Sequence, residues 1–246
     1  ENGVMLGLGW IDVGEHTAGR LVIAAHHLVV DVVSWGVLVA DLVAAWAALR
    51  SGAAATLTPV RTSMRRWSSG LRAHHASAHL PYWTDVLDGP DPVVGQRLLD
   101  PGVDRVRDMS VRDVAFPAEI TDAILVRAPA LFHAGPTDAL LAALALALAA
   151  WRRDDAPTRL VQLEGHGRQD DLVPGADTAR TVGWFTAVFP VRLNLTGLDI
   201  AEALRGGPAA GEAILRVKEH LAGVPDHGVS YGLLRHGADD DARDAL

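Results

Sequence analysis

An apolar run that ends in two histidines is the feature that most constrains what this chain folds into. Residues Leu21–Ala25 are all apolar, a pattern typical of a strand buried inside a protein. His26 and His27 follow directly, and Asp31 comes four positions after His27. The end of a strand presents side chains into a cleft on a rigid support, and imidazole titrates closest to neutral pH. The pattern therefore predicts an acid–base group at the end of this strand.

The two histidines are expected to have different roles. Successive side chains of a strand point to opposite faces, so His26 and His27 do not both reach one substrate atom. We expect one of them to be the base and the other to be structural. The same alternation argues against a metal site formed by both histidines and Asp31.

The remaining elements are predicted from hydrophobic periodicity and from glycine, proline and capping signals. Ser34 is the expected cap of the helix that follows the histidines. We expect helices over residues 34–49, 63–79, 117–128, 136–151 and 199–223. Strands are expected over residues 4–13, 21–27, 106–116 and 159–164, with another inside 181–195.

Composition excludes several classes of function. The chain has 22 Lys and Arg against 30 Asp and Glu, a net charge of −8, which argues against nucleic acid and acidic membranes as partners. It has no cysteine, which excludes disulfides and thiolate zinc sites and is compatible with the cytoplasm. The apolar run Ala139–Trp151 is too short to span a bilayer. The chain begins at Glu1 rather than at a methionine, so we expect it to be part of a longer protein.

A carboxylate and an arginine stand at the end of the strand predicted over residues 159–164. Glu164 emerges from an apolar run and begins the sequence Glu164-Gly165-His166-Gly167-Arg168. A carboxyl group in apolar surroundings is suited to accepting and returning a proton. The alternative is that Glu164 forms a structural ion pair with Arg168, and the residues alone leave both interpretations open.

One histidine pair has the spacing of metal ligands. His75 and His79 lie four positions apart on the helix predicted over residues 63–79, with His74 adjacent. No carboxylate or third ligand lies close to them in the sequence. A solvated histidine-bearing face is therefore favoured, and no metal site is predicted.

Five segments together resemble the ordered motifs of epimerization domains of non-ribosomal peptide synthetases, a branch of the condensation-domain superfamily. The histidine segment with Ser34 and Trp35 resembles HHxxxDG, residues 137–144 resemble the next helical motif, and residues 164–168 resemble EGHGR. Residues 180–190 resemble RTVGWFTxxYP, and residues 225–232 resemble PxxGxGYG. The order and spacing of five motifs make the resemblance specific.

The chain departs from these motifs at single positions. Val32 replaces the glycine that follows the signature aspartate, and a β-branched residue there narrows the site and resists positive φ. Gly36 stands where many relatives have an arginine, and Gln169 where an acid is common. Phe189 replaces a tyrosine, and Ser230 replaces a glycine.

The resemblance implies an α+β fold of two lobes, each similar to chloramphenicol acetyltransferase, with the active site between them. Residues 1–105 would form the C-terminal part of the first lobe, and residues 106–246 most of the second. Against the family's domain, the chain is expected to be incomplete at both ends.

The resemblance also implies an activity. The family inverts the α-carbon of an aminoacyl or peptidyl thioester from L to D, as an isomerase in antibiotic and other secondary metabolism. The substrate is carried on the 4'-phosphopantetheine of a carrier protein, and the domain itself binds no cofactor. The expected partners are that carrier protein and neighbouring synthetase modules, in the cytoplasm, with no nucleic acid and no membrane.

Roles are carried over from the motifs residue by residue. His27 and Glu164 are the implied catalytic acid–base pair, which would act from opposite walls of the cleft. Asp31 is expected to orient its loop through a charge-assisted bond to Arg168 or another arginine. The implied support residues are His26, Asp31, Arg168 and Trp35. The implied channel for substrate and pantetheine is formed by Gly183, Trp184, Ser230 and Tyr231.

Two other functions stay open. A condensation domain, which joins two carrier-bound acyl groups through a peptide bond, shares the histidine signature. Glu164 with its flanking glycines, and the segment from Arg180 to Phe185, favour epimerization over condensation. A degenerate relative that only docks carrier proteins is the third possibility, for which Val32 is the argument.

Overall fold

The computed structural model describes residues 3–14, 16–152, 158–237 and 240–246. They group into two compact units, each assembled from separate stretches of the chain. The first unit combines residues 1–79, 164–188 and 226–244, and the second combines 80–163, 189–225 and 245–246. Helices and small sheets occur together, which confirms the predicted α+β class. The predicted lobe boundary near residue 105 stays a prediction.

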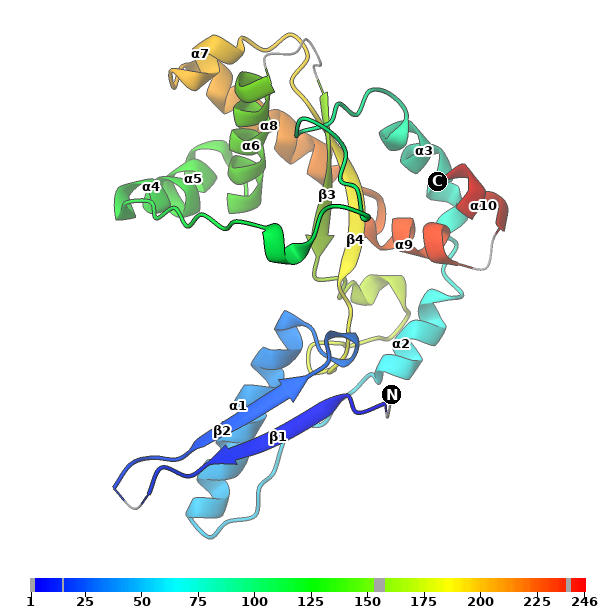
Figure 1. Ribbon diagram of the computed structural model, residues 1–246. Coiled ribbons are helices and arrows are strands. Elements are labelled where there is room, and N and C mark those ends of the chain that lie inside the picture. The colour runs from blue at the N-terminus through cyan, green and yellow to red at the C-terminus, as the bar shows by residue number, and fades with distance from the viewer. Residues whose placement is uncertain (1–2, 15, 153–157, 238–239) are drawn as a thin grey trace. The chain divides into compact units, whose positions relative to one another are not determined.

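A two-stranded antiparallel ribbon begins the first unit. Strand β1, Leu6–Ile11, pairs with β2, Arg20–Ala25, so that Leu6 lies opposite Ala25 (Figure 1). The prediction of two strands is confirmed, but the prediction that Leu21–Ala25 is buried is wrong, because most of β2 is exposed. The histidines also lie beyond the strand, since β2 ends at Ala25 and His27 begins the 3-10 turn His27–Val29.

Helix α1, Val32–Arg50, follows this turn. Its N-cap is Asp31 rather than the predicted Ser34, because the Asp31 side chain accepts a hydrogen bond from the Ser34 N–H. By length and composition alone α1 would be able to cross a membrane, with a mean hydropathy of 1.9, and so would the bent pair Ala118–Phe132 and Pro136–Arg152. Asp41 in α1, however, forms an ion pair with Arg180 of the same unit. The helix therefore carries a charge that is neutralised within the protein.

The rest of the first unit surrounds a small aromatic core. Trp67, Val173 and Phe185 are buried together there. The predicted helix over residues 63–79 is broken, since only its first part is α-helical and its last part is a separate 3-10 turn. The elements of this part of the unit are α2 Met64–Leu71, the 3-10 turns Ala76–His79, Asp170–Leu172 and Pro225–Gly228, α9 Val229–His236 and α10 Asp240–Ala245.

The second unit is mainly helical. Its α-helices are α3 Leu80–Leu87, α4 Ala118–Asp122, α5 Ala128–Phe132, α6 Pro136–Arg152, α7 Ile200–Leu204 and α8 Pro208–Ala222, and a π-helical turn, Ala123–Arg127, joins α4 to α5. Helix α6 packs against α8. Ala142 and Ala145 of α6 and Ala213 of α8 are fully buried. Trp83 of α3 is also fully buried, with its ring centroid 6.3 Å from that of Phe189.

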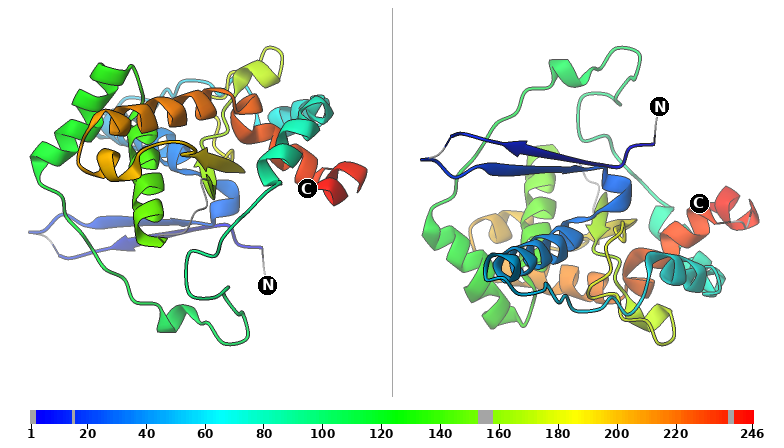
Figure 2. Two further views of the ribbon diagram at one scale, coloured as in Figure 1. Left: turned by 90° about the horizontal axis from the view of Figure 1, so that it is seen from above. Right: turned by 90° about the horizontal axis from the view of Figure 1, so that it is seen from below.

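Strands β3, Thr158–Gly165, and β4, Ala187–Asn194, form a two-stranded sheet and confirm two predicted strands. The strand predicted over residues 106–116 is wrong. That stretch contains the single 3-10 turn Val106–Asp108 and is otherwise an extended connection between α3 and α4 (Figure 2). The alternating pattern indicates a strand, but a strand needs a neighbour to pair with, and no strand among the described residues pairs with this stretch.

Candidate active site

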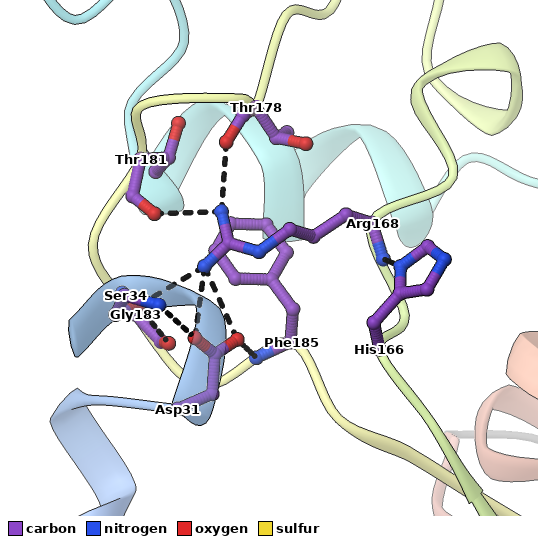
Figure 3. Close-up of polar contacts among 8 residues, drawn as sticks. All are labelled: Asp31, Ser34, His166, Arg168, Thr178, Thr181, Gly183 and Phe185. Atoms are coloured by element: carbon purple, nitrogen blue, oxygen red, sulfur yellow. Dashed lines mark hydrogen bonds and ion pairs between the residues drawn. The ribbon is translucent and has the colours of Figure 1, made fainter. Parts of the chain in front are cut away.

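A buried ion pair between Asp31 and Arg168 lies at the centre of the first unit. The Arg168 Nη2 atom lies 3.0 Å from Asp31 Oδ1 and 3.1 Å from Oδ2 (Figure 3). The two side chains are only 4% and 7% exposed. The predicted bond from Asp31 to an arginine is thereby confirmed. The alternative pairing of Arg168 with Glu164 is wrong, because the guanidinium makes its ion pair with Asp31.

The rest of the Arg168 guanidinium is held by backbone carbonyl groups and by a ring. Its Nη1 donates to the carbonyl oxygens of Thr178 and Thr181, each at 2.7 Å. Its central carbon lies 4.1 Å from the centroid of the Phe185 ring, a cation–π contact. A planar guanidinium suits such a site because it donates in several fixed directions and also stacks on an aromatic face.

Ser34 links the ion pair to the segment that contains Gly183. Its hydroxyl group accepts hydrogen bonds from Arg168 Nη2 at 3.0 Å and from the Gly183 N–H at 3.1 Å, and it donates to the Gly183 carbonyl at 3.0 Å. A serine hydroxyl has one donor and two acceptor sites, so all of them are used. Phe185 N–H adds a bond of 3.3 Å to Asp31 Oδ2. These hydrogen bonds connect the start of α1 to residues 183–185.

These bonds keep Asp31 ionised. Burial is the largest single influence on the pKa of Asp31 and by itself would raise it. Hydrogen bonds from Ser34 and the charge of Arg168 together outweigh burial, so the net effect lowers the pKa below its ordinary value of 3.8. A carboxylate that stays charged near neutral pH suits a positioning role rather than proton transfer there.

The path of the chain beside Arg168 depends on Gly167. Gly167 has φ +66°, and a Cβ atom placed there would lie 1.7 Å from the Phe185 carbonyl oxygen. The position of a Cβ atom is fixed by the backbone, and the oxygen is itself a backbone atom, so no side-chain rotation relieves this clash. Gly167 therefore permits the close approach to Phe185 next to Arg168. His166 is exposed, and its Nδ1 accepts the Arg168 N–H at 3.0 Å.

The two signature histidines have different contacts, as the sequence predicts. His26 Nδ1 accepts the Leu28 N–H at 3.2 Å and caps the 3-10 turn, although the residue is exposed rather than packed. His27 is also exposed, and its ring meets the edge of Trp184 with centroids 5.8 Å apart. Strand alternation is the wrong reason for the difference, because neither histidine lies on the strand. Of the two, His27 has the imidazole that is not used as a local cap.

The remaining predicted site residues range from buried to exposed. Glu164, near the end of β3, is exposed, and Trp35 in α1 is half-buried. Among the predicted channel residues, Trp184 is 42% exposed and Tyr231 is half-buried. Gly183 and Ser230 are buried. The roles of these residues in catalysis or in a channel stay predictions.

Val32 does not obstruct this region. It is the first residue of α1 and its side chain is 82% exposed. Positive φ occurs at three non-glycine residues in the part of the chain that the structure describes, and Val32 is not among them. The expectation that valine strains this position is therefore wrong, because the backbone here is helical.

Sequence reasoning missed the residues that complete the Arg168 site. The sequence predicts Ser34 only as a helix cap, whereas its hydroxyl bonds to the Arg168 guanidinium and to the N–H and carbonyl groups of Gly183. Thr178 and Thr181 contribute backbone carbonyls, which no side-chain pattern reveals. The spacing of Asp31 and Ser34 is that of an N-cap and the third residue of a helix, and this signal was present in the sequence.

Comparison with known proteins identifies the family. The family profile described as "Condensation domain" matches residues 2–245. The chain belongs to the condensation-domain family. Among curated members, it is 38% identical over 247 residues to chondramide synthase cmdD of Chondromyces crocatus. It is 33% identical over 230 residues to tyrocidine synthase 1 of Brevibacillus parabrevis.

Solved structures of the condensation-domain superfamily have the same fold. The epimerization domain from the third module of tyrocidine synthetase B superposes with a TM-score of 0.80 at 25% identity, over 98% of this chain. The first condensation domain of the calcium-dependent antibiotic synthetase superposes with a TM-score of 0.66 at 23% identity, also over 98%.

The chain spans only part of these relatives. The match to the chondramide synthase takes in 96% of this chain but 6% of the synthase, and the match to tyrocidine synthase 1 takes in 91% of this chain but 19% of that protein. The chain covers 52% of the epimerization-domain chain and 48% of the condensation-domain chain. The chain thus spans about half the length of these solved domain chains and a smaller share of the two synthetases.

Proposed function

We propose that this chain contributes the histidine-bearing and glutamate-bearing segments of an epimerization domain. The reaction is inversion of the α-carbon of an aminoacyl or peptidyl thioester from L to D. The observation that carries the proposal is the Asp31–Arg168 ion pair. His27 lies four residues before Asp31, and Glu164 lies four residues before Arg168. One buried contact thus fixes the two segments that bear an imidazole and a carboxyl group.

Inversion of a stereocentre needs a proton to leave one face of the α-carbon and another to arrive at the opposite face. Two acid–base groups meet this need. The exposed imidazole of His27 and the exposed carboxyl of Glu164 are the groups we assign to these steps. Asp31 and Arg168 are buried and neutralise each other, so they are assigned to positioning.

Two observations favour epimerization over condensation. The superposition on the epimerization domain, with a TM-score of 0.80, is better than that on the condensation domain, at 0.66. The sequence from Glu164 to Arg168 also reproduces EGHGR without change. The histidine signature does not separate the two activities, because both branches of the superfamily share it.

The substrate and partners follow from the same proposal. The thioester is carried on the 4'-phosphopantetheine arm of a carrier protein, which docks on this domain. The domain needs no bound cofactor of its own, since an imidazole and a carboxyl group suffice for proton transfer. Neighbouring synthetase modules in the cytoplasm supply the carrier and take the product.

A time course of chirality tests the proposal. The full-length protein is mixed with an L-aminoacyl carrier protein, and the released amino acid is resolved by chiral chromatography. Epimerization predicts a mixture of L and D forms that approaches equilibrium. Retention of pure L configuration would overturn the proposal, whether a peptide bond forms with a second carrier, as in condensation, or no product forms, as in a docking domain.

A further inference from the structure

Two histidines and an aspartate meet in the first unit away from the Asp31–Arg168 pair. His74 Nε2 lies 2.8 Å from Asp226 Oδ2, and His79 Nε2 lies 3.5 Å from the same oxygen. One ligand atom from each of the three residues lies within 4.8 Å of the other two. We propose that His74, His79 and Asp226 form a binding site for a zinc ion.

The donor set fits zinc. Zn²⁺ binds imidazole nitrogen and carboxylate oxygen, and two ligand atoms of a tetrahedral zinc ion lie about 3.3 Å apart. The two observed separations, 2.8 and 3.5 Å, are close to that spacing. Three protein ligands leave one position for water or another small ligand. Imidazole ligands also favour zinc over magnesium and calcium, which prefer sites made entirely of oxygen.

The local backbone holds Asp226 in place. Asp226 and His227 both have φ of 49°, which side-chain-bearing residues rarely adopt, and Gly228 follows with φ of 88°. Such a turn persists only where the surrounding structure fixes it. Helix α9, which follows the turn, packs against the 3-10 turn Ala76–His79. The turn that contains Asp226 leads into α9, and the contact of α9 with the turn that contains His79 positions the carboxylate beside the histidines.

The three side chains are partly buried but remain accessible to an ion. They are 22%, 34% and 13% exposed for His74, His79 and Asp226. A cavity of about 860 Å³ adjoins His74 and is also lined by His75, Arg72 and His236. This cavity offers a route for the ion and space for a fourth ligand.

The sequence prediction of no metal site has a clear origin. It paired His75 with His79 on a continuous helix and found no carboxylate nearby. The helix ends at Leu71, and His74 rather than His75 faces the third ligand. Asp226 lies 152 residues from His74, so sequence proximity gives no indication of it.

Zinc binding is tested with the purified chain, prepared without a histidine tag and freed of metal by a chelator. Calorimetric titration with Zn²⁺ is expected to give one equivalent per chain, and Co²⁺ is expected to give the visible absorption of a four-coordinate site. The variants His79→Asn and Asp226→Asn should each lower the affinity at least tenfold. His16→Asn, a change in the exposed turn between β1 and β2 and outside this cavity, should retain wild-type affinity.

Two results would overturn the proposal. One is the absence of stoichiometric Zn²⁺ binding, which would leave the cluster as a hydrogen-bonded link between two turns. The other is equal binding by wild type and by His79→Asn, which would indicate adventitious surface histidines. Because His79 is the most exposed of the three, His79→Asn keeps the test valid if Asp226→Asn does not fold.

Discussion

Arg168 contacts Asp31 at 3.0 Å although 137 positions separate them in the sequence. Both side chains are buried. Arg168 also donates a hydrogen bond to the Ser34 hydroxyl, and Asp31 also accepts one from the Phe185 N–H. The contact joins the first turn of α1 to the chain that follows β3. Together with the bond from Arg168 to Ser34, it links the segments that bear His27 and Glu164.

Removing one partner of this ion pair should destabilise the first unit strongly. Asp31→Asn and Arg168→Met should each lower the free energy of unfolding by about 3–5 kcal/mol, because each leaves a buried charge without its partner. The double variant should lose less than the sum of the single losses. Urea unfolding of the four proteins measures the coupling, and strict additivity would contradict the assigned interaction.

An exposed ion pair provides the control for this experiment. Arg61 and Asp177 lie 3.6 Å apart, with side chains 78% and 44% exposed. Solvent screens such a pair, so Arg61→Met should change the free energy of unfolding by less than about 1 kcal/mol. A loss as large as that of Arg168→Met would show that burial is not what gives the Asp31 pair its strength.

Stability should depend on the titration of Asp31. Its pKa in the folded protein is lowered from 3.8, so its contribution is fully present above that pH and is lost as the pH falls through the lower folded-state value. The difference in unfolding free energy between wild type and Asp31→Asn should be constant from about pH 5 to 7 and should narrow in more acidic solution. A difference that widened on acidification would have the wrong sign.

Gly167 and Gly36 should respond oppositely to alanine. A Cβ at Gly167 would lie 1.7 Å from the Phe185 carbonyl oxygen, whereas a Cβ at Gly36 in α1 meets nothing within 4 Å. Gly36→Ala should therefore stabilise the chain by about 0.5–1 kcal/mol through helix propensity. Gly167→Ala should destabilise it by more than about 3 kcal/mol, through backbone strain and displacement of Arg168. Thermal unfolding of both variants is the measurement, and a neutral Gly167→Ala would contradict the predicted clash.

Trp184 should position the His27 ring. Their edge contact, with centroids 5.8 Å apart, is worth about 0.5–1.5 kcal/mol, so Trp184→Ala should slow epimerization by up to about tenfold. Trp184→Phe keeps an aromatic partner and should recover most of the rate. Turnover numbers of the full-length protein and the two variants are the measurement. Equal turnover in the alanine and phenylalanine variants would exclude a role for the ring contact.

Sequence reasoning succeeded where a residue pattern has a local physical meaning. The apolar helix that begins at Pro136 and the strand that ends near Glu164 were predicted from periodicity and punctuation, and the structure confirms both. The partnership of Asp31 with an arginine was predicted as a charge-assisted bond, with Arg168 named as a candidate.

It failed where the outcome depends on what lies opposite. The apolar run of β2 indicates burial, yet composition does not say which segment covers a face, and in the described chain most of this strand is exposed. The alternation in residues 106–116 indicates a strand, but no strand of the described chain pairs with it. The contact of His74 with Asp226 was not predictable, because 152 positions separate the two residues and a left-handed turn at Asp226 directs the carboxylate.

The most direct test of the central claim is exchange of the substrate α-proton with solvent deuterium. The full-length protein is incubated with an L-aminoacyl carrier protein in deuterated buffer, and label at the α-carbon is followed by mass spectrometry. His27→Ala and Glu164→Ala, together, should reduce exchange by at least about a hundredfold, since each group supplies a proton-transfer step. His16→Ala, in the exposed turn between β1 and β2, should exchange at the wild-type rate. Exchange at the wild-type rate in the double variant would contradict the assignment of both residues.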